Sequence, residues 1–200
     1  MYLTNSALYV ASSTHQALEQ LDRSHGQLPN LELSPLYDVL KHNENYLEAN
    51  AFYQISKDGI ESCSRDSCDE LAGQSPMNTI VLYFNDQQNI LVFNGEEKVL
   101  TPNQAAMLRH FLLRCNKENP GTRANLVDFF GKTGVDGLVK KANLVKAIER
   151  LRSKLDAVGI PFIIEPTRYQ DDIAYFFNES VPYIVMFRVD DAYGSEYINR

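Results

Sequence analysis

The chain has 200 residues, of which 44% are hydrophobic and 22% charged, and its formal net charge is -7. These proportions are ordinary for a soluble globular protein of one large domain or two small ones. No basic region followed by a long apolar run opens the chain, and its most apolar stretch, residues 181–189, is too short to span a bilayer. We therefore expect a cytoplasmic protein without a membrane segment.

The N-terminal residues allow two predictions of secondary structure. Residues 7–11 form an apolar run that fits a short strand, and Ser12 and the two residues after it can cap a helix that ends near Leu21. A helix that begins at Asn5 fits nearly as well.

The next segments are easier to assign. Ser34 followed by Pro35 is typical of a helix N-terminus, and the apolar positions predict a helix over residues 35–47. Residues 51–56 and 60–64 flank an Asp-Gly pair and predict a β-hairpin. Residues 64–76 are polar and contain glycine and proline, so we interpret them as a linker.

A second group of strands follows this segment. Residues 79–84 and 90–93 are apolar and rich in β-branched and aromatic side chains. Asn94-Gly95 is the strongest short hairpin signal, and residues 98–100 return as a third strand. The three strands predict a small antiparallel sheet.

Helix signals then dominate. Thr101-Pro102 opens a helix, with Gln104 at the reciprocal position of a capping box. Apolar residues three and four apart carry this helix to Cys115, and Thr122 can cap a short helix that reaches Phe130.

The C-terminal third predicts one long helix and three strands. The helix covers residues 138–158, where Gly159 and Pro161 end it. Residues 162–165 and 173–177 form a strand pair around an intervening loop, and residues 183–189 form a last strand.

Three segments carry a resemblance to a known family. Residues 94–108 contain a Leu-Thr-Pro step from strand to helix, residues 123–131 end in Phe-Gly, and residues 148–155 read Ile-Glu-Arg-Leu-Arg-Ser-Lys-Leu. In this order and spacing they resemble the OmpR/PhoB-type effector domain of bacterial response regulators. The resemblance covers residues 78–177 and implies a winged helix that binds DNA.

The sequence departs mildly from that family at Gln104, where Glu is usual, and more strongly at the wing and before the sheet. Residues 168–175, at the position of the wing, contain no glycine and two acids, Asp171 and Asp172. The 75 residues before the sheet are too few for a receiver domain, which needs about 110–120 residues. The acidic pair of a receiver would fall at Ser12-Ser13, so we expect no phosphoryl-aspartate switch.

The predicted fold class is α+β. We expect a winged helix-turn-helix with an N-terminal antiparallel sheet at residues 78–177, preceded by a small α/β region at residues 1–75. That region is either a truncated receiver-like relic or a surface for a partner. Residues 178–200 would add a C-terminal strand and tail.

Charge is distributed unevenly. Residues 101–168 contain twelve Lys and Arg against six Asp and Glu, a net charge of +6, and the rest of the chain carries -13. A basic segment in an acidic protein is typical of a face that meets phosphates, although a solvated helix surface can look the same.

The long helix separates its apolar and basic side chains. At 100° per residue, Leu144, Ile148, Leu151 and Leu155 form one stripe, and the opposite side suits the major groove, where Arg and Lys donate to guanine and Asn pairs with adenine. Ion pairs of its cations with Glu149 or Asp156 are the alternative. The candidate DNA-binding residues are Asn143, Lys146 and Arg150 for bases, and Thr122, Arg123, Lys140, Lys141, Lys154 and Arg168 for the flanks.

No signature of an enzyme or a cofactor site is present. The four histidines are dispersed, and no nucleophile elbow, phosphate loop or dinucleotide fingerprint occurs. The three cysteines, Cys63, Cys68 and Cys115, lack zinc-finger spacing, and their odd number argues against a disulfide framework, so we expect free thiols.

The predicted function is therefore sequence-specific binding of double-stranded DNA by a cytoplasmic bacterial transcription regulator. It would act as a dimer or with another regulatory protein docked on residues 1–75. The alternative is a winged-helix interaction module that binds a protein partner and not DNA, because a fold does not determine a function.

Overall fold

The computed structural model describes residues 35–85, 87–126 and 141–190. The chain divides into two compact units, residues 1–49 and 50–200. Helix α2 (Pro35–Ala49) is the described part of the first unit and confirms the helix predicted from Pro35. The strand or helix predicted within residues 5–21 lies outside the described residues.

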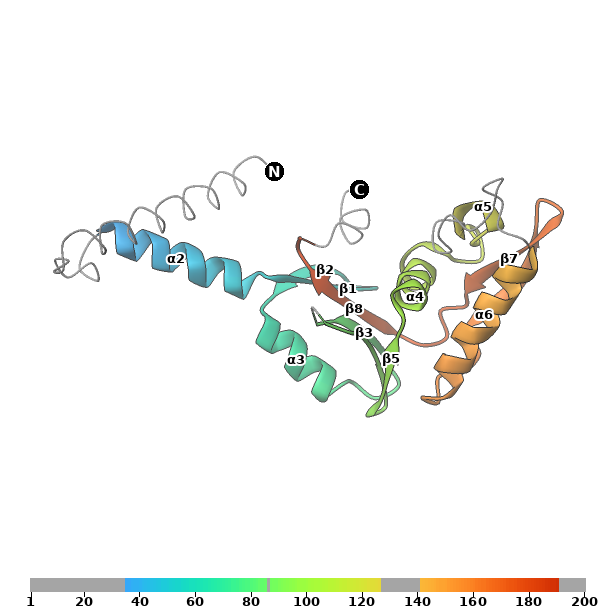
Figure 1. The fold of residues 1–200 in the computed structure, drawn as a ribbon, viewed down its shortest axis with the longest axis horizontal. Helices are drawn as coiled ribbons and strands as arrows, with labels where there is room; N and C mark the ends of the chain where they lie inside the picture. Colours follow the sequence, from blue (N-terminus) through green and yellow to red (C-terminus); the bar gives the residue numbers. More distant parts are fainter. Residues whose placement is uncertain (1–34, 86, 127–140, 191–200) are drawn as a thin grey trace. The chain divides into compact units, whose positions relative to one another are not determined.

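The second unit is built on a six-stranded sheet (Figure 1). Its order is β2-β1-β8-β3-β4-β5, and all neighbours are antiparallel except β3 and β8, which run parallel. The strands are β1 (Phe52–Ser56), β2 (Gly59–Cys63), β3 (Ile80–Phe84), β4 (Asn89–Phe93), β5 (Glu96–Leu100) and β8 (Tyr183–Arg188).

Both predicted hairpins are confirmed. Ser56 pairs with Gly59, so β1 and β2 are joined by a two-residue turn. Asn94 and Gly95 join β4 to β5 with positive φ angles of 51° and 83°. Two central residues with positive φ form a type I′ turn, whose twist matches that of the flanking strands, and this explains the Asn-Gly pair.

The last strand is central and not an appendage. The sequence placed residues 178–200 outside the 78–177 unit, whereas β8 lies between β1 and β3 and connects both groups of strands. Val185, Met186 and Phe187 are all buried because helix α3 (Arg65–Gly73) covers one face of the sheet and helix α4 (Pro102–Arg114) the other. A strand buried on both faces has a continuous apolar sequence, as residues 181–189 do. The predicted three-stranded sheet is therefore half of a larger one.

Helix α3 (Arg65–Gly73) corrects the predicted linker at residues 64–76. Ser64 caps it by accepting a hydrogen bond from the Ser67 backbone amide, which satisfies an otherwise unpaired donor. Cys68, with Leu71 and Ala72, packs against Val81 and Tyr83 on one sheet face. A few apolar residues in a polar segment were enough to bury one side of this helix.

Helix α4 (Pro102–Arg114) covers the opposite face, and Figure 1 shows α3 and α4 on the two sides of the sheet. The predicted capping box is confirmed: the Gln104 amide donates to Thr101 Oγ1 (3.4 Å), and the Thr101 amide donates to Gln104 Oε1 (3.1 Å). These two bonds and Pro102 at the first helical position fix where the helix begins.

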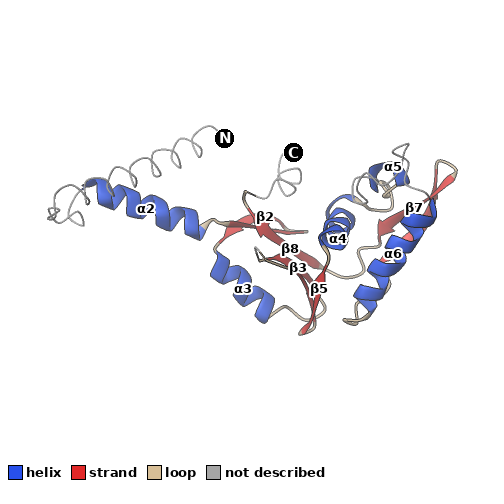
Figure 2. Ribbon diagram, viewed as in Figure 1, coloured by secondary structure: helices blue, strands red, loops and turns tan. Residues whose placement is uncertain are grey.

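In the described part of the chain, two helices and a hairpin follow α4 before the last strand (Figure 2). They are α5 (Arg123–Leu126), α6 (Lys141–Asp156), β6 (Ile164–Tyr169) and β7 (Asp172–Phe177). The hairpin is longer than predicted, because only Gln170 and Asp171 form its turn and both have positive φ, 48° and 62°. The chain is thus α+β, with α4, α5, α6, the hairpin and one face of the sheet sharing a hydrophobic core.

Within the described segments, no helix combines the length and the apolar character that a membrane crossing requires.

Candidate nucleic-acid interface

Helix α6 has the two sides that its sequence predicts. Leu144, Ile148, Leu151 and Leu155 are at most 3% exposed and belong to the core shared with α4. Lys146 and Arg150 are exposed to solvent. Four buried leucine and isoleucine side chains hold this helix in one orientation, so its outer side is fixed relative to α4 and the hairpin.

The outer side of α6 carries a stripe of polar and basic residues, here called the α6 stripe: Asn143, Lys146, Arg150 and Lys154. At 100° per residue these four positions fall within an arc of about 80°. They extend over about 17 Å of the helix axis, since each residue adds about 1.5 Å. Asn143 is exposed like Lys146 and Arg150, while Lys154 is half-buried at the edge of the stripe.

The carboxylates of α6 lie beside the stripe. Glu149 and Asp156 are exposed and fall on its flank toward one edge of the apolar side. Neither Lys146 nor Arg150 forms a salt bridge with Glu149, Asp156 or any other carboxylate of the described residues. The ion pairs that the sequence offered as an alternative are therefore not formed between described residues.

Arg152 has a different role from its neighbours on the helix. Its Nε and Nη2 donate to the Ile164 carbonyl oxygen at 3.1 and 2.6 Å. Its guanidinium stacks on the rings of Phe162, at 4.3 Å, and Tyr175, at 5.5 Å. Burial lowers the pKa of this group, and Tyr175 and Glu149 oppose that shift. Arg152 thus attaches α6 to the hairpin.

Helix α4 holds further basic groups in the interior. Arg109 is only 6% exposed, and its guanidinium lies 5.0 Å from the centre of the Phe187 ring on β8. Burial and the charge of Arg114 lower the pKa of His110, which favours the neutral imidazole. The twelve basic residues of the sequence segment therefore overstate the charge that faces solvent.

The start of α5 is tied to the hairpin. Gly121 and Tyr175 exchange two backbone hydrogen bonds, at 2.7 and 3.0 Å. A Cβ on Gly121 would lie 3.0 Å from Cys115 Sγ and 3.2 Å from a ring carbon of Phe111, so a larger residue here would require these side chains to shift by a few tenths of an ångström. Next along the chain, half-buried Thr122 hydrogen-bonds Asn125 and caps α5, and half-buried Arg123 follows it.

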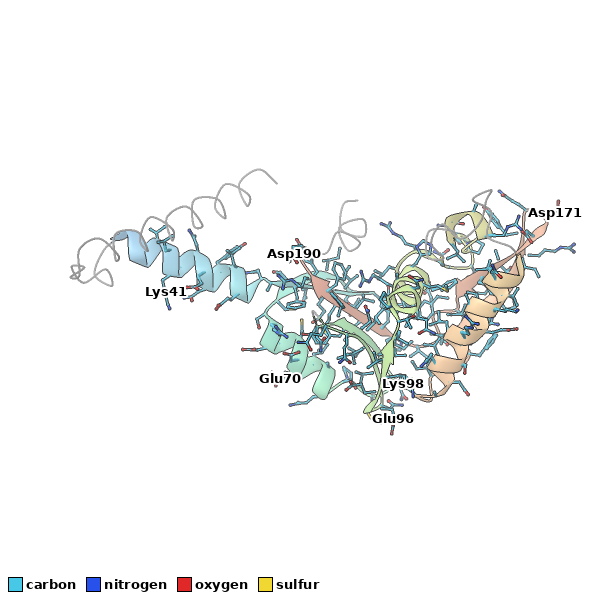
Figure 3. All side chains as sticks on the ribbon, in the orientation of Figure 1. Lys41, Glu70, Glu96, Lys98, Asp171 and Asp190 are labelled. Carbon is cyan, nitrogen blue, oxygen red and sulfur yellow. The ribbon has the colours of Figure 1, made fainter. Side chains whose placement is uncertain are left out.

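The hairpin tip carries mixed charge. Arg168 is exposed on β6, and Asp171 lies at the turn, as Figure 3 shows. Asp172 begins β7 and accepts a hydrogen bond from the Ile173 amide at 2.8 Å. The tip therefore has one basic and two acidic side chains, in contrast to the α6 stripe.

Two of the predicted DNA-binding residues lie at or before the start of α6. Lys140 lies outside the described residues, and Lys141 is the first residue of α6. The predicted set thus includes one stripe on α6 and separate residues on α5 and the hairpin. Sequence reasoning missed the role of Arg152, because its partners Phe162, Ile164 and Tyr175 are distant in sequence and no local pattern pairs them.

Within the described ranges, no three His, Cys, Asp or Glu side chains are grouped so that they could bind a metal ion.

Comparison with solved structures gives partial similarity. The solved structure of a lantibiotic response regulator, the C-terminal domain of the nisin resistance regulator NsrR, is 18% identical to this chain. The match covers 50% of this chain and 92% of that domain, with a TM-score of 0.37. At this identity and TM-score the similarity is too weak to assign a fold or a function. No protein-family model and no curated protein matches the sequence.

Proposed function

We propose that the chain is a DNA-binding transcription regulator of the OmpR/PhoB winged-helix type and that α6 enters the major groove. One observation carries the proposal: the α6 stripe is basic and solvent-facing, while the opposite side of the same helix is buried. A helix that inserts into a groove needs both properties, a fixed orientation and outward donors.

The arrangement around α6 supports this assignment. In a winged helix, two helices precede the recognition helix and a hairpin follows it, and α4, α5, α6 and β6–β7 have this order. The major groove is about 12 Å wide and admits one α-helix. Arg152 and the Gly121–Tyr175 bridge fix the hairpin beside α6 and α5, so the supporting elements are tied to the reading helix.

The side chains then divide by role. Arg150 and Lys146 would donate to guanine O6 and N7, and Asn143 would pair with adenine. Lys140, Lys141 and Lys154 on α6 or just before it, with Arg123 and Arg168, would contact phosphates, which position the protein and supply affinity without reading sequence. Thr122 lies next to Arg123, but its hydroxyl already caps α5.

Charge sets the strength of binding. Outside residues 101–168 the chain carries a net charge of -13, which repels DNA. We therefore propose moderate affinity per chain, raised when two chains bind adjacent half-sites. The acidic side chains of the hairpin tip oppose phosphate contact at the turn, and this favours α6 as the element that enters the groove.

Binding of fluorescent duplexes by the full chain at low salt tests the proposal. The duplexes are those that the wild-type chain selects from a random-sequence pool. Arg150→Ala should weaken binding to them about 5- to 150-fold, equivalent to about 1–3 kcal/mol.

Arg65→Ala is the matched control, because Arg65 is an exposed arginine on α3, which packs on the sheet face opposite α4. It should change binding less than twofold. Equal effects of the two variants, or no duplex selected at all, would refute DNA binding by α6.

A second function, docking of a protein partner, is favoured by α2. Val39, Tyr46 and Leu47 are 56%, 62% and 40% exposed. Side chains seven and eight residues apart lie on one side of a helix, so α2 presents an apolar face. We propose that this face joins two copies of the chain.

Sedimentation of the full chain tests this association. Leu47→Glu should shift the wild-type dimer to monomer. Lys41→Glu, on the opposite side of α2, should leave the dimer intact. A monomeric wild-type chain would exclude a homodimer.

A further inference from the structure

Two thiols meet at the junction of β2 and α3. Cys63 ends β2, Cys68 lies in the second turn of α3, and their Sγ atoms are 3.2 Å apart. Both are free thiols. This pair lies outside the candidate DNA interface, and neither the fold nor the proposed function requires it.

The backbone between the two cysteines fixes their approach. The Ser67 amide donates to Ser64 Oγ at 3.2 Å, and the Cys68 amide donates to the Ser64 carbonyl at 3.2 Å. These bonds form the N-terminal cap of α3 and turn the chain from strand to helix. The two sulfur atoms are therefore held facing each other by secondary structure.

The two thiols differ in burial. Cys63 is half-buried, whereas Cys68 is 1% exposed and packs with Val81, Tyr83 and Met186. Burial and the hydrogen bond with Cys63 raise the pKa of Cys68. The more accessible thiol of Cys63 thus lies against the buried thiol of Cys68. This is the arrangement of an attacking and a resolving cysteine.

The third cysteine provides an internal comparison. Cys115 is 5% exposed and lies in the other core cluster, against the Gly121 backbone. Burial raises the pKa of Cys115 to about 12. It is a buried thiol without the exposed neighbour that Cys68 has.

We propose that Cys63 and Cys68 form a dithiol–disulfide exchange site that reacts with small-molecule disulfides such as oxidised glutathione. The Cys63 thiolate attacks one sulfur of the small disulfide, forms a mixed disulfide and expels one thiolate. The Cys68 sulfur then loses its proton, attacks Cys63 Sγ and expels the second thiolate. The protein loses two electrons and two protons, and the small disulfide becomes two thiols.

The product links two elements that are otherwise joined only through the Ser64 turn and side-chain packing. A disulfide needs the sulfur atoms at about 2.05 Å, so each has to move only by about half an ångström. The bond ties the end of edge strand β2 to α3. The proposed disulfide forms between β2 and α3, so its formation is independent of what α6 binds.

Thiol counting after treatment of the native full chain with oxidised glutathione tests the proposal. The wild-type chain should keep one of its three thiols, without an intermolecular product. Cleavage after Arg65 by trypsin separates the two cysteines, so the disulfide should appear as two linked peptides in mass spectrometry.

Three variants discriminate the steps. Cys115→Ser is the matched control and should still lose two thiols. Cys63→Ser should keep both remaining thiols, and Cys68→Ser should stop as a stable glutathione adduct on Cys63. Three persistent thiols in the wild-type chain, a wild-type reaction that stops at the adduct, or loss of the Cys115 thiol would overturn the proposal. Because Cys63 is half-buried, Cys63→Ser keeps the test valid if Cys68→Ser does not fold.

Discussion

Among the described residues of 101–168, some basic side chains are packed against other parts of the fold and others face solvent. Arg109 and Arg152 are packed against aromatic rings, and Arg152 is hydrogen-bonded to the backbone of β6. Lys146 and Arg150 face solvent. Arg150 and Arg152 are only two residues apart, but two residues rotate a helix by about 200°, so one holds the hairpin and the other faces outward.

This comparison shows why charge along the sequence is a poor measure of a binding surface. The segment has a net charge of +6, but part of it stabilises the fold. The surface outside α6 is also uneven, since the hairpin turn carries Asp171. Binding to a polyanion is therefore expected to depend on one stripe and not on the total charge.

Replacing each arginine should give the largest contrast. Arg152→Ala removes two hydrogen bonds to the Ile164 carbonyl and the stacking on Phe162, and should lower the free energy of unfolding by about 2–3 kcal/mol. Arg150→Ala should change it by less than about 0.5 kcal/mol, as surface substitutions usually do. Urea denaturation measures both, and similar losses would show that the two side chains are not divided between interior and surface.

Changing the hairpin turn should have a smaller effect. Asp171 has a φ of 62°, which glycine adopts without strain, so Asp171→Gly should raise the free energy of unfolding by about 0.5 kcal/mol. Both Asp171→Gly and Asp171→Asn remove a negative charge and should increase DNA affinity about 2- to 5-fold. Asn tolerates positive φ at least as well as Asp does, so it should give the affinity gain with little added stability. Unchanged affinity in both variants would place the turn away from DNA.

The smallest effect is expected at His110. Its pKa is lowered in the folded protein by burial and by Arg114, so the unfolded chain binds more protons near pH 6. The stabilisation from the neutral imidazole is present above the unfolded pKa of about 6.5 and is lost as the pH falls below it. Between pH 7.5 and pH 5, the wild-type chain should lose more unfolding free energy than His110→Gln. Equal losses would show that His110 titrates as it does in the unfolded chain.

Local signals predicted most elements, and long-range pairing was not predictable from them. Thr101-Pro102 with Gln104, and Asn94-Gly95, each specify backbone geometry within four residues, and both were confirmed. Helix α3 was missed because its buried side has too few apolar residues to show a period. The position of β8 between β1 and β3 joins segments more than 90 residues apart, and no local pattern encodes it.

Part of the candidate site was also predictable from local sequence. The apolar and polar sides of α6 follow from helical geometry alone, so the exposure of Lys146 and Arg150 was predictable. The role of Arg152 was not, because it depends on the hairpin folding back over the end of the helix. Whether the predicted residues contact DNA stays a prediction.

The salt dependence of duplex binding tests the central claim that the α6 stripe binds DNA. If the wild-type chain neutralises about 4–6 phosphates, the logarithm of its affinity should fall with the logarithm of salt concentration at a slope of about -4 to -5. Lys141→Ala, at the first residue of α6, should weaken all sequences alike and reduce that slope by about one. Arg150→Ala should lower affinity for the selected duplex more than for a random one and relax the preference at one base pair. A slope near zero, or the same slope and sequence preference in all three proteins, would contradict DNA binding by this helix.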